Sequence, residues 1–129
     1  MTGRTGRTPG LSIATGLDIA EVARIERVLE RSPGFAQRYF TAGERERCAS
    51  SRQRAREFAT LFAVKEALLK ALGTGVLGPI GLTQIEVHRA GKQTTVALSG
   101  AAAQAVGSRR VWVSTACDGR QAWAVVVVS

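Results

Sequence analysis

Cysteine is scarce in this sequence, which has two, Cys48 and Cys117, among 129 residues. Two cysteines cannot form the disulfide framework on which small extracellular domains rely. We therefore expect both side chains to be reduced thiols of a cytoplasmic protein, because disulfides are rare in that compartment. No acid–base pattern accompanies Cys117, so we do not expect it to be a catalytic nucleophile.

Long hydrophobic runs are also absent. The apolar segment 125–128 is far too short to cross a membrane, and we expect no membrane partner. Residues 1–10 are rich in Thr, Gly and Arg and lack the apolar stretch of a secretory signal. We expect them to form a flexible N-terminal tail. Residues 11–129 have a length that suits a single domain.

Aromatic residues make up only 5% of the chain, whereas the formal net charge is +8. The core must therefore consist mainly of Val, Leu, Ile and Ala. A basic surface attracts anionic partners such as nucleic acid, anionic lipid, phosphorylated ligands or an acidic protein. The aromatics are not interleaved with the basic residues and no nucleic-acid reading motif is present, so we expect no nucleic-acid partner. A basic nucleic-acid-binding module remains an alternative interpretation.

Helix and strand signals follow one another in an order typical of an α+β domain. The helices predicted from apolar spacing and stop signals lie at 18–31, 42–49, 54–72 and 100–106. The strands predicted from alternating polarity lie at 11–17, 84–89, 93–98, 111–115 and 122–128. Thr41 and Glu44 form a capping-box pattern, and Asp118-Gly119 is a hairpin-turn signal. Together they predict an antiparallel sheet and a long buried helix.

Charged side chains interrupt the apolar surface of the helix predicted over 54–72. Lys65 falls near the middle of its apolar stripe, and Glu66 and Lys70 lie along the edge. Isolated charges are costly on a buried helix unless they are paired. One interpretation is structural, with Glu66 and Lys70 as an i,i+4 pair and Lys65 reaching toward water. The other is a site in which the carboxylate binds a metal ion and the two ammonium groups bind phosphate.

Asp18 allows the same two interpretations. With Glu21 three residues later it fits a helix N-cap. It also offers a carboxylate to a metal ion. Mg2+ typically takes one or two protein carboxylates, several waters and substrate phosphates. Asp18 and Glu66 would satisfy that requirement if the fold brought them together, which the sequence alone does not decide.

Two long segments contain the charged residues discussed above. Residues 16–25 read GLDIAEVARI, and residues 62–73 read FAVKEALLKALG. The first is similar to the pattern G-[IL]-D-I-x-E-x-x-R-I and the second to F-A-x-K-E-A-x-x-K-A-x-G. Both patterns are those of the holo-[acyl-carrier-protein] synthase family, the small bacterial 4′-phosphopantetheinyl transferases, which this chain therefore resembles. The separation of the two segments also fits the family. Weaker matches at 40–44 and 111–122 extend the resemblance over nearly the whole domain.

This resemblance implies a reaction as well as an α+β fold. Family members move 4′-phosphopantetheine from coenzyme A to a serine of an acyl carrier protein and release 3′,5′-ADP, with Mg2+ as cofactor. The resemblance implies that Asp18 and Glu66 hold Mg2+ and that Lys70 contacts the coenzyme A diphosphate. Glu66 is also our candidate for the base that takes the proton of the serine hydroxyl.

The same resemblance suggests contacts for both substrates. The residues expected to shape the coenzyme A site or approach the nucleotide are Lys65, Lys70, Gly73, Thr74 and Gly75. Helix termination would explain the two glycines equally well. The residues expected to contact the acidic carrier protein are Arg24, Arg27 and Arg31. Family members are usually homotrimers with active sites between subunits, so we expect a trimer.

Three positions depart from the family pattern. Leu61 stands where most members have an arginine, and Cys117 where many have a histidine near the diphosphate. Residues 91–93 read Gly-Lys-Gln in place of a Gly-x-Pro turn, and the only histidine, His88, does not obviously replace the missing one. The metal-binding pair is intact, which favours a divergent but active transferase. The alternative is a weakened or inactive homologue that binds a carrier protein or coenzyme A.

Overall fold

The structure is a computed structural model that describes residues 12–75 and 78–129. The predicted tail, residues 1–10, lies outside the described residues, so the division into a tail and a single domain stays a prediction. The helices are α1 (Val22–Arg31), α2 (Phe35–Tyr39), α3 (Ala42–Ala49), α4 (Arg54–Ala71), the 3-10 helix η1 (Leu82–Gln84) and α5 (Gly100–Val106). The strands are β1 (Ala14–Glu21), β2 (Ile85–Ala90), β3 (Gln93–Leu98), β4 (Val111–Cys117) and β5 (Gln121–Val128).

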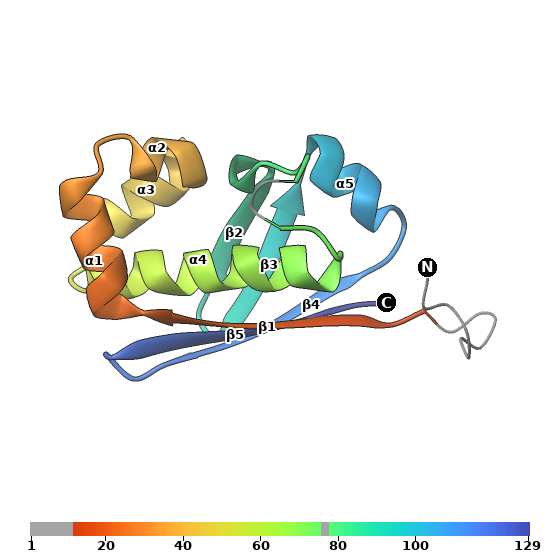
Figure 1. Cartoon of the computed structure of the whole chain (residues 1–129). Helices are drawn as coiled ribbons and strands as arrows, with labels where there is room; N and C mark the ends of the chain where they lie inside the picture. The colour runs from red at the N-terminus through yellow and green to blue at the C-terminus, as the bar shows by residue number, and fades with distance from the viewer. Residues whose placement is uncertain (1–11, 76–77) are drawn as a thin grey trace.

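The strands form two sheets, and all of their pairings are antiparallel, as is typical of an α+β fold. One sheet has the order β1-β5-β4, and β2 and β3 form a separate hairpin. The helix α4 lies along the three-stranded sheet, with α1, α2 and α3 at one end and α5 at the other (Figure 1). The α+β class and the antiparallel pairing are confirmed. The strands are divided between two sheets, whereas the sequence had suggested one.

The long helix forms the centre of the core. It packs against β1 and β5, and more than half of its residues are buried, including Phe58, Leu61 and Leu68. Its predicted bounds, 54–72, match α4 to within one residue because no Pro or Gly interrupts it. Among the described residues, no helix is both long enough and apolar enough to span a membrane.

The first strand is longer than predicted and the first helix starts later. β1 pairs with β5 from Ala14 to Glu21, so Asp18 lies within a strand. The predicted helix start at Asp18 is therefore wrong, and so is its interpretation as an N-cap. The N-cap position belongs to Glu21, whose side chain makes no capping hydrogen bond. Pairing with a distant strand outweighs the local capping signal, which the sequence alone could not reveal.

The capping box and the hairpin turn were predicted more reliably than the start of the first helix. The capping box is present, because Thr41 Oγ1 accepts from the Glu44 backbone N–H and Glu44 Oε1 accepts from the Thr41 N–H. Gly119 has φ of +90° in the turn between β4 and β5. Ser99 occupies the N-cap of α5, but its side chain makes no capping hydrogen bond.

Candidate active site

A close approach between β1 and α4 builds the first part of the site. Gly16 is buried against α4, where a Cβ atom would overlap the Ala67 carbonyl oxygen and lie 2.9 Å from the Ala71 nitrogen. Side chains two residues apart in a strand point to the same face. Asp18 therefore faces α4, on the same side of β1 as Gly16.

Lys70 binds β1 across this contact. Its ammonium donates to Asp18 Oδ1 at 2.9 Å and to the Leu17 carbonyl oxygen at 3.0 Å. The Asp18 side chain is 16% exposed and that of Lys70 is 57% exposed. The i,i+4 pair predicted between Glu66 and Lys70 is absent from the ion pairs of the described residues. Lys70 thus joins the helix to the strand.

Glu66 and Asp18 line one cleft of about 410 Å³. Burial raises the pKa of Glu66, the negative charge of Asp18 raises it further, and Lys70 opposes the shift. Arg24 lines the same cleft, whose apolar wall comprises Ile25, Val28, Phe35 and Phe62. Asp18, Glu21 and Glu66 all line this cavity, and the carboxylates of Asp18 and Glu66 come from different elements, β1 and α4.

This donor set fits a hard divalent cation that is also bound by its substrate. Carboxylate oxygens suit Mg2+, which commonly takes one or two of them and fills its other positions with water and phosphate oxygens. No group of three or more His, Cys, Asp or Glu side chains suited to a metal ion occurs in the described parts of the chain. Asp18 and Glu66 could therefore hold Mg2+ only with oxygens from elsewhere.

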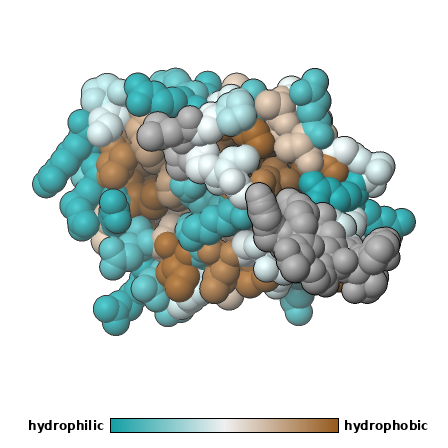
Figure 2. All heavy atoms as spheres, turned by 45° about the vertical axis from the view of Figure 1, so that its right-hand side comes forward, coloured by the Kyte–Doolittle hydropathy of each residue, from teal (hydrophilic) through white to brown (hydrophobic). Residues whose placement is uncertain are grey.

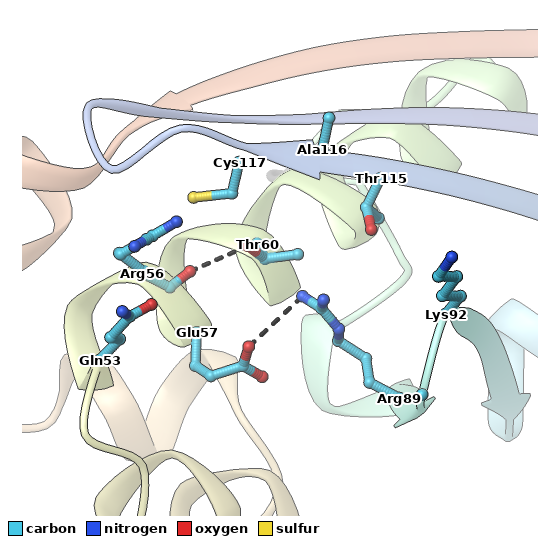
Figure 3. A pocket seen from close by; sticks show the side chains of 10 residues that line it. Gln53, Arg56, Glu57, Thr60, Arg89, Lys92, Thr115, Ala116 and Cys117 are labelled. Carbon is cyan, nitrogen blue, oxygen red and sulfur yellow. Dashed lines mark hydrogen bonds and ion pairs between the residues drawn. The ribbon is translucent and has the colours of Figure 1, made fainter.

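A second, basic pocket was not predicted from the sequence. It has a volume of about 470 Å³ and is lined by Gln53, Arg56, Glu57, Thr60, Arg89, Gly91, Lys92, Thr115, Ala116 and Cys117. Figure 3 shows that these residues come from α4, from Gln53 just before it, from the β2–β3 hairpin and from β4. Arg89 pairs with Glu57 at 3.4 Å, whereas Arg56 and Lys92 form no ion pair within residues 12–75 and 78–129. The pocket therefore has an excess of positive charge that favours an anion.

Comparisons with known proteins identify the family. The family model described as the 4′-phosphopantetheinyl transferase superfamily matches residues 14–126. A holo-[acyl-carrier-protein] synthase of Geotalea daltonii is 38% identical over 120 residues, which cover 88% of this chain and 95% of that protein. The protein of the same name from Anaeromyxobacter sp. (strain Fw109-5) is 43% identical over 125 residues, covering 90% and 94%. This chain belongs to the holo-[acyl-carrier-protein] synthase family.

A solved structure of a family member agrees with the fold. The crystal structure of Helicobacter pylori holo-[acyl-carrier-protein] synthase in complex with coenzyme A is 30% identical and superposes with a TM-score of 0.78. The match covers 89% of this chain and 99% of that one. The family resemblance of the sequence is thereby confirmed.

Two of the three departures from the family pattern line the basic pocket. Cys117 and the Gly91-Lys92 turn line it, and Leu61 follows the lining residue Thr60. The Leu61 side chain is a buried core residue. His88 is half exposed and pairs with Glu86 at 3.3 Å. The departures at Cys117 and at the Gly91-Lys92 turn, which line the pocket, were the sequence signal that could have pointed to it.

Lys65 does not line the cleft, and its expected contact with coenzyme A needs correction. Its ammonium is fully buried and donates to Glu44 Oε1 at 2.7 Å, to the Leu82 carbonyl oxygen at 2.8 Å and to the Tyr39 carbonyl oxygen at 3.0 Å. All three donors of the ammonium are used. Burial lowers the pKa of Lys65, and Glu44 opposes that shift. Lys65 therefore links α4 to its neighbours and has no free donor for a phosphate.

The other predicted residues lie at the surface. Arg24, Arg27 and Arg31 are exposed on α1 and line a shallow pocket of about 270 Å³. The turn after α4 begins at Gly73, which has φ of +76°, and the Thr74 N–H donates to the Leu69 carbonyl oxygen at 2.9 Å. Helix termination explains this turn. Thr74 Oγ1 is buried without a hydrogen-bond partner among the described residues.

Proposed function

We propose that this chain transfers 4′-phosphopantetheine from coenzyme A to a serine of an acyl carrier protein, with Mg2+ as cofactor and 3′,5′-ADP as the second product. The convergence of Asp18 and Glu66 on one cleft is the observation that carries the proposal. The relatives named as holo-[acyl-carrier-protein] synthases support it. The Helicobacter pylori crystal structure supports it too, because that family member is in complex with coenzyme A.

In this proposal Asp18, Glu66 and Lys70 each have a role in the transfer. Asp18 and Glu66 would hold Mg2+, which would offset the charge on the diphosphate oxygens during transfer. The Lys70 ammonium would bind the same diphosphate oxygens and offset part of their negative charge. The serine oxygen forms a bond to the β-phosphorus of coenzyme A, and the bond from that phosphorus to the 3′,5′-ADP oxygen breaks. Glu66, whose pKa is raised, is the base that we propose for the hydroxyl proton.

The basic pocket supports an active enzyme over the weakened alternative. Leu61 and Cys117 remove an expected arginine and histidine, but Arg56, Arg89 and Lys92 supply three cations to one pocket. We propose that these side chains bind the anionic nucleotide of coenzyme A. The turn Gly73, Thr74 and Gly75 directly follows α4 and remains a proposed neighbour of the nucleotide.

The surface of α1 supports an acidic protein partner. Arg24 lies at the edge of the carboxylate cleft, and Arg27 and Arg31 extend the positive charge away from it. An acidic carrier protein that docked there would bring its serine toward the cleft. Electrostatic attraction of this kind speeds encounter and fixes orientation. We place the reaction in the cytoplasm, where both free cysteines would remain reduced.

The outer face of the three-stranded sheet supports assembly into a homotrimer. Leu17, Ile19, Trp112 and Val125 lie on this face and are 54%, 48%, 53% and 43% exposed. Figure 2 shows hydrophobic side chains at the surface along the lower side of the molecule, where this sheet lies. An apolar surface of this kind commonly marks a protein interface. The number of subunits comes from the family resemblance.

Intact-protein mass spectrometry tests the proposal. Apo acyl carrier protein incubated with this chain, coenzyme A and Mg2+ should gain the mass of one phosphopantetheine group. Asp18→Asn and Glu66→Gln should slow the gain by at least about 10–100-fold, the loss typical even of groups around a metal site. Glu46→Gln, at an exposed carboxylate on α3, is the matched control and should leave the rate unchanged.

The same experiment separates the two candidate functions. If the chain binds coenzyme A but several carrier proteins gain no mass, it is the binding protein suggested by Leu61 and Cys117. If both cleft variants transfer as fast as the wild type, the assignment of the site is wrong.

A further inference from the structure

Lys70 pairs with the carboxylate of Asp18 on β1 and not with that of Glu66 on its own helix. Its two hydrogen bonds, at 2.9 and 3.0 Å, both end on β1, at Asp18 Oδ1 and at the Leu17 carbonyl oxygen. Glu66 precedes Lys70 by one helical turn, in the orientation that favours an ion pair. No ion pair forms there in the part of the chain that the structure describes. Asp18 is thus paired with Lys70, whereas Glu66 forms no ion pair among the described residues.

The pairing places a positive charge against a carboxylate that a divalent cation would also bind, and two cations close together on one carboxylate repel each other. Asp18 Oδ1 already accepts from the ammonium, which is the more exposed partner of the pair. Lysine is a compact charge on a flexible four-carbon stem, and this side chain is 57% exposed, so it can leave without disrupting the core. The positive charge bound to Asp18 is therefore carried by a movable group.

We infer that Lys70 stands in for the divalent cation at Asp18 while the cleft is empty, and that the cation must displace it. This inference rests on the proposed function, which places Mg2+ at Asp18 and Glu66. The displaced ammonium is then free to bind the coenzyme A diphosphate. The cation and coenzyme A each favour the same position of Lys70, so each tightens the binding of the other by the same factor.

A purely structural ion pair would behave differently. If the pair only fastened α4 to β1, its loss would change stability and leave cation affinity almost unchanged. If Lys70 acted only through its charge at a distance, any cation of the cleft would have a similar effect. Arg24 lines the same cleft and makes no ion pair among residues 12–75 and 78–129. It therefore provides a matched charge that does not occupy Asp18.

Mn2+ binding to the full-length chain tests the inference without relying on activity. The concentration of free Mn2+ is measured by electron paramagnetic resonance, with and without coenzyme A. In the absence of coenzyme A, Lys70→Met should bind Mn2+ at least about fivefold more tightly than the wild type, the lower end of typical coupling between sites. Arg24→Met should change the affinity by less than about twofold, as expected for a screened charge. The factor by which coenzyme A tightens Mn2+ should be smaller in Lys70→Met than in the wild type.

Two results would overturn this inference without affecting the proposed function. One is equal Mn2+ affinity in Lys70→Met and the wild type, and the other is an equal gain in Arg24→Met and Lys70→Met. Asp18→Asn distinguishes these from failure of the proposed function. If Asp18→Asn leaves Mn2+ affinity unchanged, the cation does not bind at Asp18, and both the metal assignment and this inference are wrong. Circular dichroism of each variant establishes that it is folded.

Discussion

Lys65 and Lys70 lie on the same helix, and their surroundings give them different roles. The sequence placed both at the apolar surface of α4 and suggested phosphate contacts for each. In the structure Lys65 is enclosed by Glu44 and two carbonyl oxygens. Lys70 is exposed and binds Asp18. Helical spacing gives the direction of a side chain but not its partners, because Glu44 and Asp18 come from distant segments.

Replacement of Lys65 should destabilise the fold. Lys65→Met leaves the Glu44 carboxylate buried without its ammonium partner, so the free energy of unfolding should fall by about 3–5 kcal/mol. Lys70→Met removes a pair whose ammonium is largely exposed, and its loss should be no more than about 1 kcal/mol. Urea denaturation measures both. Equal stability of the two variants would contradict the structural role of Lys65.

Replacement of Glu66 should stabilise the metal-free protein at neutral pH. The pKa of Glu66 is raised, first by burial and then by Asp18. A carboxyl whose pKa is higher in the folded than in the unfolded state lowers stability once it ionises, and the cost vanishes below its ordinary pKa. Glu66→Gln should therefore raise the melting temperature of the metal-free protein at neutral pH. The gain should shrink as the pH falls toward about 4.

Differential scanning fluorimetry in the presence of a chelator measures this shift. Glu46→Gln serves as the control, because Glu46 is exposed and its replacement should leave the melting temperature unchanged at each pH. A lower melting temperature for Glu66→Gln at neutral pH would mean that the Glu66 charge is better compensated than the structure indicates.

At the scale of elements, the contact between β1 and α4 determines the site. The sequence predicted α4 almost to the residue, because its helix formers and stop signals are local. It placed the end of β1 at residue 17, because the pairing of Asp18 with Ala124 is not local. The family pattern nevertheless singled out Asp18 and Glu66, since the two motifs contain the residues that this contact brings to one cleft.

Gly16 should be intolerant of any side chain. Gly16→Ala places a Cβ atom against the Ala67 carbonyl oxygen and the Ala71 nitrogen. The two elements must then move apart, at a cost of about 1–3 kcal/mol, and Asp18 must shift relative to Glu66. We expect lower stability in urea together with a lower transfer rate at temperatures where the variant is folded.

Gly81→Ala is a matched substitution, because an added Cβ would meet only ordinary contacts, with Gln84 Nε2 at 3.9 Å. It should have little effect on either measurement. A fully active and stable Gly16→Ala variant would show that the close approach of β1 to α4 is not required.

At the scale of the whole molecule, the three-stranded sheet has two unlike faces. The inner face packs on α4 and carries Asp18, while the outer face exposes Leu17, Ile19 and Val125. Strand alternation follows from the sequence once the strands are known. The basic pocket does not, because α4, the β2–β3 hairpin and β4 assemble it from separate segments. Sequence patterns could therefore point to the carboxylates of Asp18 and Glu66, which line one cleft, but not to this pocket.

Charge on the outer face should prevent assembly. Ile19→Glu places a carboxylate in the proposed interface between subunits, where burying an unpaired charge is costly. Size-exclusion chromatography with light scattering should show a trimer for the wild type and a smaller species for the variant. Thr95→Glu, at an exposed position of β3, should remain a trimer. A monomeric wild type would contradict the proposed assembly.

Anomalous scattering from crystals grown with Mn2+ and coenzyme A tests the central claim most directly. The account predicts one strong Mn2+ peak between the carboxylates of Asp18 and Glu66, in contact with the coenzyme A diphosphate, with the Lys70 ammonium moved away from Asp18. A Mn2+ ion bound elsewhere, or carboxylates of Asp18 and Glu66 that do not share the ion, would contradict it.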